Sequence, residues 1–309
     1  MSTPVRLLAF AAALAAVFVL ALVGARTLLP AGSAQAGSGR TGTQEESGME
    51  HSSASTPSAQ HSEDSHAKPG QAPAADPVRG LTVAQDGYQL GALTAPAVVG
   101  EDGTLSFRLT GPDGNPVTDY TTAHDKDLHL IVVRSDGSRF RHVHPSLDGA
   151  GIWSMPWRWA APGSYRVFAD FVPAATGETL TLTSTLEVAG DLQPVLLGED
   201  TTESTVDGLT VTMDGAPAAG TSSMLTFTVT RDGPPVSLQP YLGAAGHLVA
   251  LRVGDLAYLH VHPMDGPAGE SGPEVAFMAE APTPGRYLLY LDFQVDGRVH
   301  TATFTTTAR

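Results

Sequence analysis

The chain has 309 residues, enough for two folded domains with hydrophobic cores of their own. It contains no cysteine, which excludes structural disulfides, thiolate metal sites, blue-copper centres and cysteine nucleophiles. Its net charge of −15, with only 17 basic residues, lacks the electrostatic footprint of a nucleic-acid-binding protein, so we expect no nucleic-acid partner.

The first predicted element, residues 1–30, is an export segment. Leu7 to Ala25 carries no charge and is mostly Ala, Leu, Val and Phe, and as a helix rising ~1.5 Å per residue it spans the hydrocarbon core of a bilayer. This length favours an uncleaved transmembrane anchor; a signal peptide cleaved at Ala34-Gln35-Ala36 is the alternative. Arg6 favours a cytoplasmic N-terminus. We therefore expect a single-pass protein of the cell membrane with extracytoplasmic domains, or a secreted protein if the signal is cleaved.

Residues 31–78 form the second predicted element, a disordered linker. They are rich in Ser, Ala, Gly, Gln and Pro and hold almost no large apolar residues, so they bury too little surface to fold. Three histidines lie here, His51, His61 and His66. We expect them to be solvated linker residues; a weak metal-collecting tail is the alternative.

Residues 79–190 and 206–309 are two copies of one domain, joined by a linker at 191–205. LHLIVVRSDGSRFRHVHP (128–145) aligns without a gap on GHLVALRVGDLAYLHVHP (246–263), and PGSYRVFADF (162–171) matches PGRYLLYLDF (284–293). Because the matching segments follow the same order in both copies, they indicate a duplication rather than chance similarity.

Each copy has the pattern of an antiparallel β-domain. Short runs rich in Val, Thr, Leu, Tyr and Phe are interrupted every 8–12 residues by Asp-Gly, Gly-Pro or Pro-Gly turns, and no amphipathic helical stretch follows residue 30. About seven such strands per hundred residues are typical of an immunoglobulin-like sandwich; a small barrel is the alternative. The predicted fold class is all-β, with two tandem immunoglobulin-like antiparallel β-sandwich domains after an N-terminal transmembrane helix and a disordered linker.

Both copies carry histidines in the pattern H-x12-H-x-H: His129, His142 and His144 in the first, and His247, His260 and His262 in the second. A two-residue turn at Asp136-Gly137 would pair Ser135 with Ser138 and place His129 opposite His144, with His142 two residues away. The three rings then share one face, with Cβ atoms about 5–7 Å apart, and can reach one zinc or copper ion at about 2 Å.

The second copy repeats this arrangement around a Gly254-Asp255 turn, so that His247 faces His262. Pro145 and Pro263 end the histidine strands and place both clusters near the rim of the sandwich. The alternative is that these histidines are outward polar positions, or buried rings that bond to backbone carbonyls. His124 aligns with Leu242, and therefore does not belong to the pattern that the copies share.

Asp170 and Asp292 occupy equivalent places in otherwise apolar strands. Either carboxylate could be a fourth metal ligand or could accept a hydrogen bond from a ligand histidine. A structural salt bridge or a turn contact is the alternative interpretation.

With the string HLVALRVGDLAYLHVHP in view, the chain resembles anchored or secreted actinobacterial proteins described as heavy-metal-binding. More distantly it is similar to the YtkA-like and CopC-like immunoglobulin-type modules of extracytoplasmic copper handling. The resemblance covers mainly residues 206–306 and implies the fold and location better than an activity. The N-terminal histidine of the CopC pattern is missing here.

These observations predict an extracytoplasmic, membrane-anchored protein that buffers or delivers copper or zinc with one three-histidine cluster per domain. Its expected partners are the metal ion, the membrane and another extracytoplasmic metal-handling protein. The alternative, from another class, is a structural or adhesive tandem with no metal. A zinc hydrolase ranks last because no base network or pocket-forming insertion is visible, so we expect no enzymatic activity.

Overall fold

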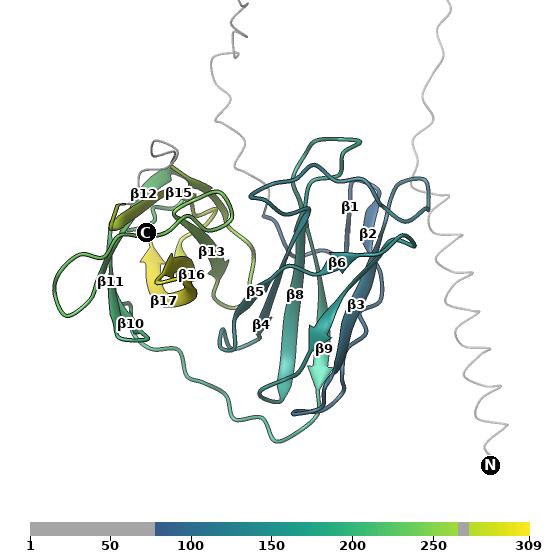
Figure 1. The fold of residues 1–309 in the computed structure, drawn as a ribbon, viewed down its shortest axis with the longest axis horizontal. Coiled ribbons are helices and arrows are strands. Elements are labelled where there is room, and N and C mark those ends of the chain that lie inside the picture. The colour runs from purple at the N-terminus through teal and green to yellow at the C-terminus, as the bar shows by residue number, and fades with distance from the viewer. Residues whose placement is uncertain (1–77, 265–271) are drawn as a thin grey trace, which may run out of the picture. The chain divides into compact units, whose positions relative to one another are not determined.

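The computed structural model describes residues 78–264 and 272–309, which belong to one compact unit. The predicted membrane segment at 1–30 and the predicted linker up to residue 77 lie outside the described residues. Within the described ranges every regular element is a β-strand (Figure 1). No helix with the length and apolar character of a membrane span occurs in them.

The first nine strands form module 1, which has two antiparallel sheets. One sheet has the order β1-β2-β3-β7-β6, and the other has the order β5-β4-β8-β9. The bounds in the first sheet are β1 Ala84–Gln85, β2 Tyr88–Leu90, β3 Gly103–Thr110, β7 Ile152–Trp157 and β6 Ser146–Leu147. Those in the second are β5 Arg141–Val143, β4 Leu128–Arg134, β8 Gly163–Phe171 and β9 Leu180–Val188.

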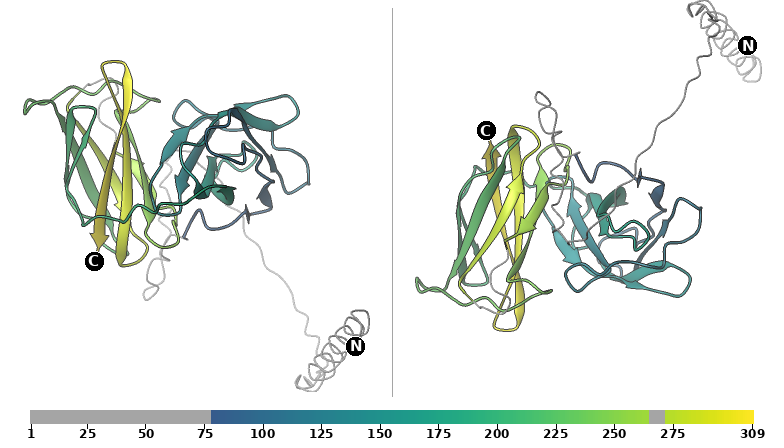
Figure 2. Two further views of the ribbon diagram at one scale, coloured as in Figure 1. Left: turned by 90° about the horizontal axis from the view of Figure 1, so that it is seen from below. Right: turned by 90° about the horizontal axis from the view of Figure 1, so that it is seen from above.

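The last eight strands form module 2, which repeats this plan. Its sheets have the orders β10-β11-β12-β15-β14 and β13-β16-β17. The bounds in the first are β10 Glu203–Val206, β11 Leu209–Asp214, β12 Ser222–Thr230, β15 Glu274–Glu280 and β14 His260–Pro263. Those in the second are β13 Gly246–Arg252, β16 Gly285–Val295 and β17 Arg298–Ala308. Figure 2 shows the two layers of this module, with β16 and β17 in yellow and β11 and β12 in green.

The two sheets of each module pack face to face around a core of its own. In β3, alternate residues Leu105, Phe107 and Leu109 are buried, as expected for a strand with one face on a core. They pack with Leu130 and Val132 of the opposite sheet. The predicted all-β class with tandem antiparallel sandwiches is therefore confirmed for the described residues.

Strands β4 and β13 are buried on both faces. Leu130 and Val132 of β4 belong to the core of module 1, whereas the intervening Ile131 and Val133 belong to a third apolar cluster. That cluster joins the two modules, because it also holds residues of β13 and β16. Its buried members are Ile131, Val133, Phe168, Val249, Leu251, Leu256, Leu288 and Tyr290.

Candidate metal centre

The histidine hairpin of module 1 has the predicted register, although its turn differs. Ile131 lies opposite His142 in the β4–β5 ladder, as expected. The Gly137 N–H donates to the Arg134 carbonyl (2.8 Å) and the Arg134 N–H donates to the Ser138 carbonyl (2.9 Å). The loop therefore has three residues rather than two, and the predicted pairing of Ser135 with Ser138 is wrong. Arg139, with φ of 59°, is an extra residue that restores the register at the histidines.

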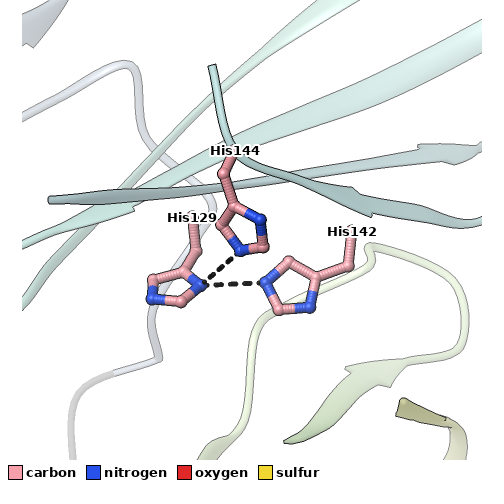
Figure 3. Close-up of side chains that lie close together, drawn as sticks. All are labelled: His129, His142 and His144. Carbon is pink, nitrogen blue, oxygen red and sulfur yellow. Dashed lines mark hydrogen bonds between the residues drawn. The ribbon is translucent and has the colours of Figure 1, made fainter. Parts of the chain in front are cut away.

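Three imidazole nitrogens of module 1 converge at the end of this hairpin (Figure 3). His129 Nδ1 lies 2.9 Å from His142 Nε2 and 3.2 Å from His144 Nε2. The ligand atoms of these three histidines all lie within 4.8 Å of one another. Nitrogens bound tetrahedrally to zinc at 2.0–2.1 Å are separated by about 3.3 Å. The cluster therefore has the spacing of a metal site.

Two hydrogen bonds fix where the ring protons of His129 and His142 lie. His129 Nε2 is 3.0 Å from the carbonyl oxygen of Ala123, and His142 Nδ1 is 2.9 Å from Asp292 Oδ2. Since a carbonyl and a carboxylate only accept, these two nitrogens carry the protons in the neutral rings. His129 Nδ1 and His142 Nε2 then face each other with lone pairs. Such a pair repels unless a cation or an additional proton lies between the two nitrogens.

Burial keeps the rings of His129 and His144 neutral. It lowers the pKa of His129 and that of His144 to about 3, and neighbouring imidazoles lower both further, while the Ala123 carbonyl opposes the shift at His129. His247 follows the same pattern, with its pKa lowered to about 4 chiefly by burial. Neutral imidazole is the form that binds metals, so protons do not compete for these rings near neutral pH.

The two equivalent aspartates occupy matching places but have different partners. Asp170 lies opposite His129 on the neighbouring strand, and Asp292 lies opposite His247. Asp292 accepts hydrogen bonds from His142 of the other module and from Thr301 (2.5 Å). Asp170 accepts one from Thr181 (2.6 Å), and its burial raises the pKa of its carboxyl. Asp292 thus orients a histidine across the module boundary.

The second predicted cluster is built differently from the first. Leu251 bridges Tyr258, which is the expected register for the Gly254-Asp255 hairpin. The ribbon then separates, because β14 pairs with β15 of the opposite sheet, with His262 opposite Met278. The predicted pairing of His247 with His262 is therefore wrong. The side chains of His260 and His262 lie outside the described part of the structure, so their role as ligands stays a prediction.

His247 of module 2 lies instead beside the histidines of module 1. Its Nε2 donates to the carbonyl of Tyr241 (2.9 Å), as His129 does to that of Ala123. Its ring centroid lies 6.1 Å from that of His142 and 5.1 Å from that of His124. His124 is exposed, and the comparison of the two repeats does not indicate it as a site residue, because its equivalent is Leu242.

These side chains line one cavity of about 190 Å³ between the modules. Module 1 contributes His124, His129 and His142, and module 2 contributes His247 and Tyr258. The cavity therefore brings the exposed His124 and two histidines of the triad, His129 and His142, to one space.

The fold and the cluster define a tandem β-sandwich protein with a histidine centre where its modules meet. A family model described as "Domain of unknown function (DUF8832)" matches residues 82–190 and 204–309. The chain belongs to this family, and each module contains one of the two matches. No curated protein matches the chain.

Several solved structures show a distant similarity. The adhesin InvE of Yersinia pseudotuberculosis is 14% identical, with a TM-score of 0.23 over 71% of this chain and 58% of that one. Invasin, a bacterial integrin-binding protein, is 14% identical, with a TM-score of 0.21 over 72% and 39%. A putative membrane anchored protein of Corynebacterium diphtheriae is 11% identical, with a TM-score of 0.22 over 71% and 57%. The chain spans less than two thirds of the length of each of these proteins.

Proposed function

We propose that this protein binds one copper or zinc ion through His129, His142 and His144. The observation that carries the proposal is that His129 Nδ1 and His142 Nε2 lie 2.9 Å apart, while the other nitrogen of each ring bonds to an acceptor, so that the two lone pairs face each other. A cation removes that repulsion and gains three nitrogen ligands. Imidazole ligands suit copper and zinc, and the absence of thiolates gives no preference for a softer ion.

The proposed role is to buffer the ion or to deliver it outside the cytoplasm. Three ligands leave a position open on a tetrahedral ion, where a ligand from a second metal-handling protein can enter. The apolar run from Leu7 to Ala25 supports a membrane anchor that holds the modules on the extracytoplasmic side. In this proposal the protein is a carrier and has no enzymatic activity.

The alternative is a structural or adhesive tandem that binds no metal. Two of the similar structures, InvE and invasin, carry adhesive names, although likeness at that level assigns no role. The apolar cluster that joins the modules supports this alternative, because burial of its side chains stabilises the pair without an ion.

Calorimetric titration of the full chain in detergent with Cu(II), Cu(I) and Zn(II) decides between the two. We expect the variant His142→Ala/His144→Ala to lose one equivalent of bound metal. The variant His51→Ala/His61→Ala/His66→Ala is the control for a metal-collecting linker and should retain that equivalent. Unchanged stoichiometry in the first variant would overturn the assignment of the ion to the triad, and no binding by the unaltered chain would leave only the structural alternative.

A further inference from the structure

The aromatic contacts between the modules come in two equivalent pairs. Phe140 of module 1 stacks on Tyr290 of module 2, with ring centroids 4.0 Å apart and an interplanar angle of 4°. Tyr258 of module 2 packs on Phe168 of module 1 at 5.8 Å. In the aligned repeats Phe140 corresponds to Tyr258, and Phe168 corresponds to Tyr290. Each contact is therefore the other one with the roles of the modules exchanged.

The same exchange relates other contacts of this surface. Arg166 of module 1 donates to the carbonyl of Asp255 in the hairpin of module 2 (3.4 Å). At the equivalent positions, Leu288 of module 2 lies against Gly137 in the hairpin of module 1. A surface is isologous when each contact between two residues recurs between the equivalent residues with the two partners exchanged, as in two-fold symmetric dimers. The modules therefore pack like the two halves of such a dimer.

Two polar side chains of module 2 reach across this surface to the histidine centre. Asp292 accepts the Nδ1 proton of His142, and both side chains are almost fully buried, with 5% and 4% exposure. His247 forms part of the cavity wall beside the triad. If module 2 moved away, His142 would lose the carboxylate that orients it and the triad would open to water.

We propose that the modules dock through this self-complementary surface and that docking completes the metal centre, so that docking and metal binding are linked. The metal half of this inference rests on the proposed function, whereas the docking half does not. By thermodynamic reciprocity, an ion that binds the docked pair more tightly stabilises docking by the same factor. Loss of a carboxylate that orients a ligand histidine typically lowers metal affinity about 10–100-fold, which sets the size of the expected coupling.

Docking can be separated from ligation with the variant Leu251→Asp. Leu251 belongs to the cluster between the modules and not to the core of module 2, so a carboxylate there opposes docking and leaves the sandwich intact. Because the chain has no cysteine, the exposed positions Thr185 in module 1 and Val299 in module 2 can be changed to Cys and spin-labelled cleanly. Pulsed electron paramagnetic resonance then measures the distance between the modules in the full chain.

We expect a narrow distribution of spin-label distances in the parent chain and a broad one in Leu251→Asp. The metal affinity of Leu251→Asp should be about 10–100-fold lower than that of the parent chain, although its triad is unchanged. Asp292→Asn should lower the affinity about tenfold while the modules stay docked. Asp170→Asn is the matched control from the equivalent strand position and should stay within about twofold, because Asp170 bonds to Thr181 instead of a triad histidine. Circular dichroism verifies that each variant is folded.

The outcomes distinguish the two proposals. Undocking in Leu251→Asp with unchanged metal affinity would overturn the linkage, and a narrow distribution in that variant would overturn the assigned surface. If the parent chain binds no metal, the proposed function fails, while the spin-label distances still decide whether the modules dock through this surface.

Discussion

Acidification should destabilise the metal-free protein well above the pH at which its carboxylates titrate. Burial lowers the pKa of His129 and His144 to about 3 and that of His247 to about 4, from an ordinary value of 6.5. Between these values the unfolded chain binds protons that the folded chain does not. Stability therefore falls as the pH falls through this window, because unfolding takes up protons.

The expected size follows from the same shifts. At pH 5 a histidine with an unfolded pKa of 6.5 and a folded pKa near 3 contributes about 2 kcal/mol of destabilisation. The three histidines together should cost about 4–6 kcal/mol between pH 7 and pH 5, with the smallest share from His144, the least buried of the three. Asp170 opposes this loss, since its raised pKa stabilises the fold on acidification.

Urea unfolding at pH 7 and pH 5 in the presence of a chelator measures this difference. The variant His129→Gln should lose about 2 kcal/mol of the pH dependence, because the substituted side chain does not titrate. His51→Gln, in the predicted linker, should retain all of it. The reasoning would be refuted if His129→Gln and the parent chain changed equally with pH.

Three further outcomes follow from the contacts described in the structure. Arg134→Ala should lower the free energy of unfolding in urea by about 3–5 kcal/mol, because the buried guanidinium is paired with Asp136. Arg158→Ala removes only an exposed ion pair and should lower it by less than about 1 kcal/mol. Gly137→Ala should lower the free energy of unfolding by about 2–3 kcal/mol, since the φ of Gly137 is 81° and the new Cβ would meet Leu288. Gly114→Ala is the control: Gly114 has a φ of 79° and open space around it, so this change should cost about 1 kcal/mol in the same assay. Metal at a hundred times its Kd should raise the free energy of unfolding by about 3 kcal/mol, an increase that calorimetry should not find in His142→Ala/His144→Ala.

The sequence predicted the features that depend on local periodicity. Alternating apolar residues in strands such as β3 and the turn residues between strands define the antiparallel sheets, and the repeated segments define two modules. The spacing of the module 1 histidines correctly predicts the register of Ile131 with His142, although the turn differs from the predicted one. Two differences at the turn, a longer loop and the extra residue Arg139, compensate for each other.

The contributions of Asp292, His247 and His124 to the centre could not be predicted from strand spacing, because they depend on how one module packs on the other. One signal was nevertheless present. LHLIVVR in β4 and GHLVALR in β13 are apolar at nearly every position and do not alternate. A strand with that composition is buried on both faces and therefore requires a second packing partner. The sequence contains no comparable signal that β14 pairs with β15. The segment HVHP is the same at 142–145 and at 260–263, so it does not distinguish the two modules.

The segment that connects β9 to β10 makes the pairing of the two modules a unimolecular event. Val195 in this segment donates to Asp136 (2.8 Å), and Leu197 packs on the apolar cluster between the modules. Two separate chains with the same surface would dissociate on dilution, whereas tethered partners experience an effective concentration of about millimolar. A single continuous chain therefore keeps its halves together however scarce it is. The sequence of each half can also diverge independently. For example, His124 of module 1 and Leu242 of module 2 stand at equivalent positions.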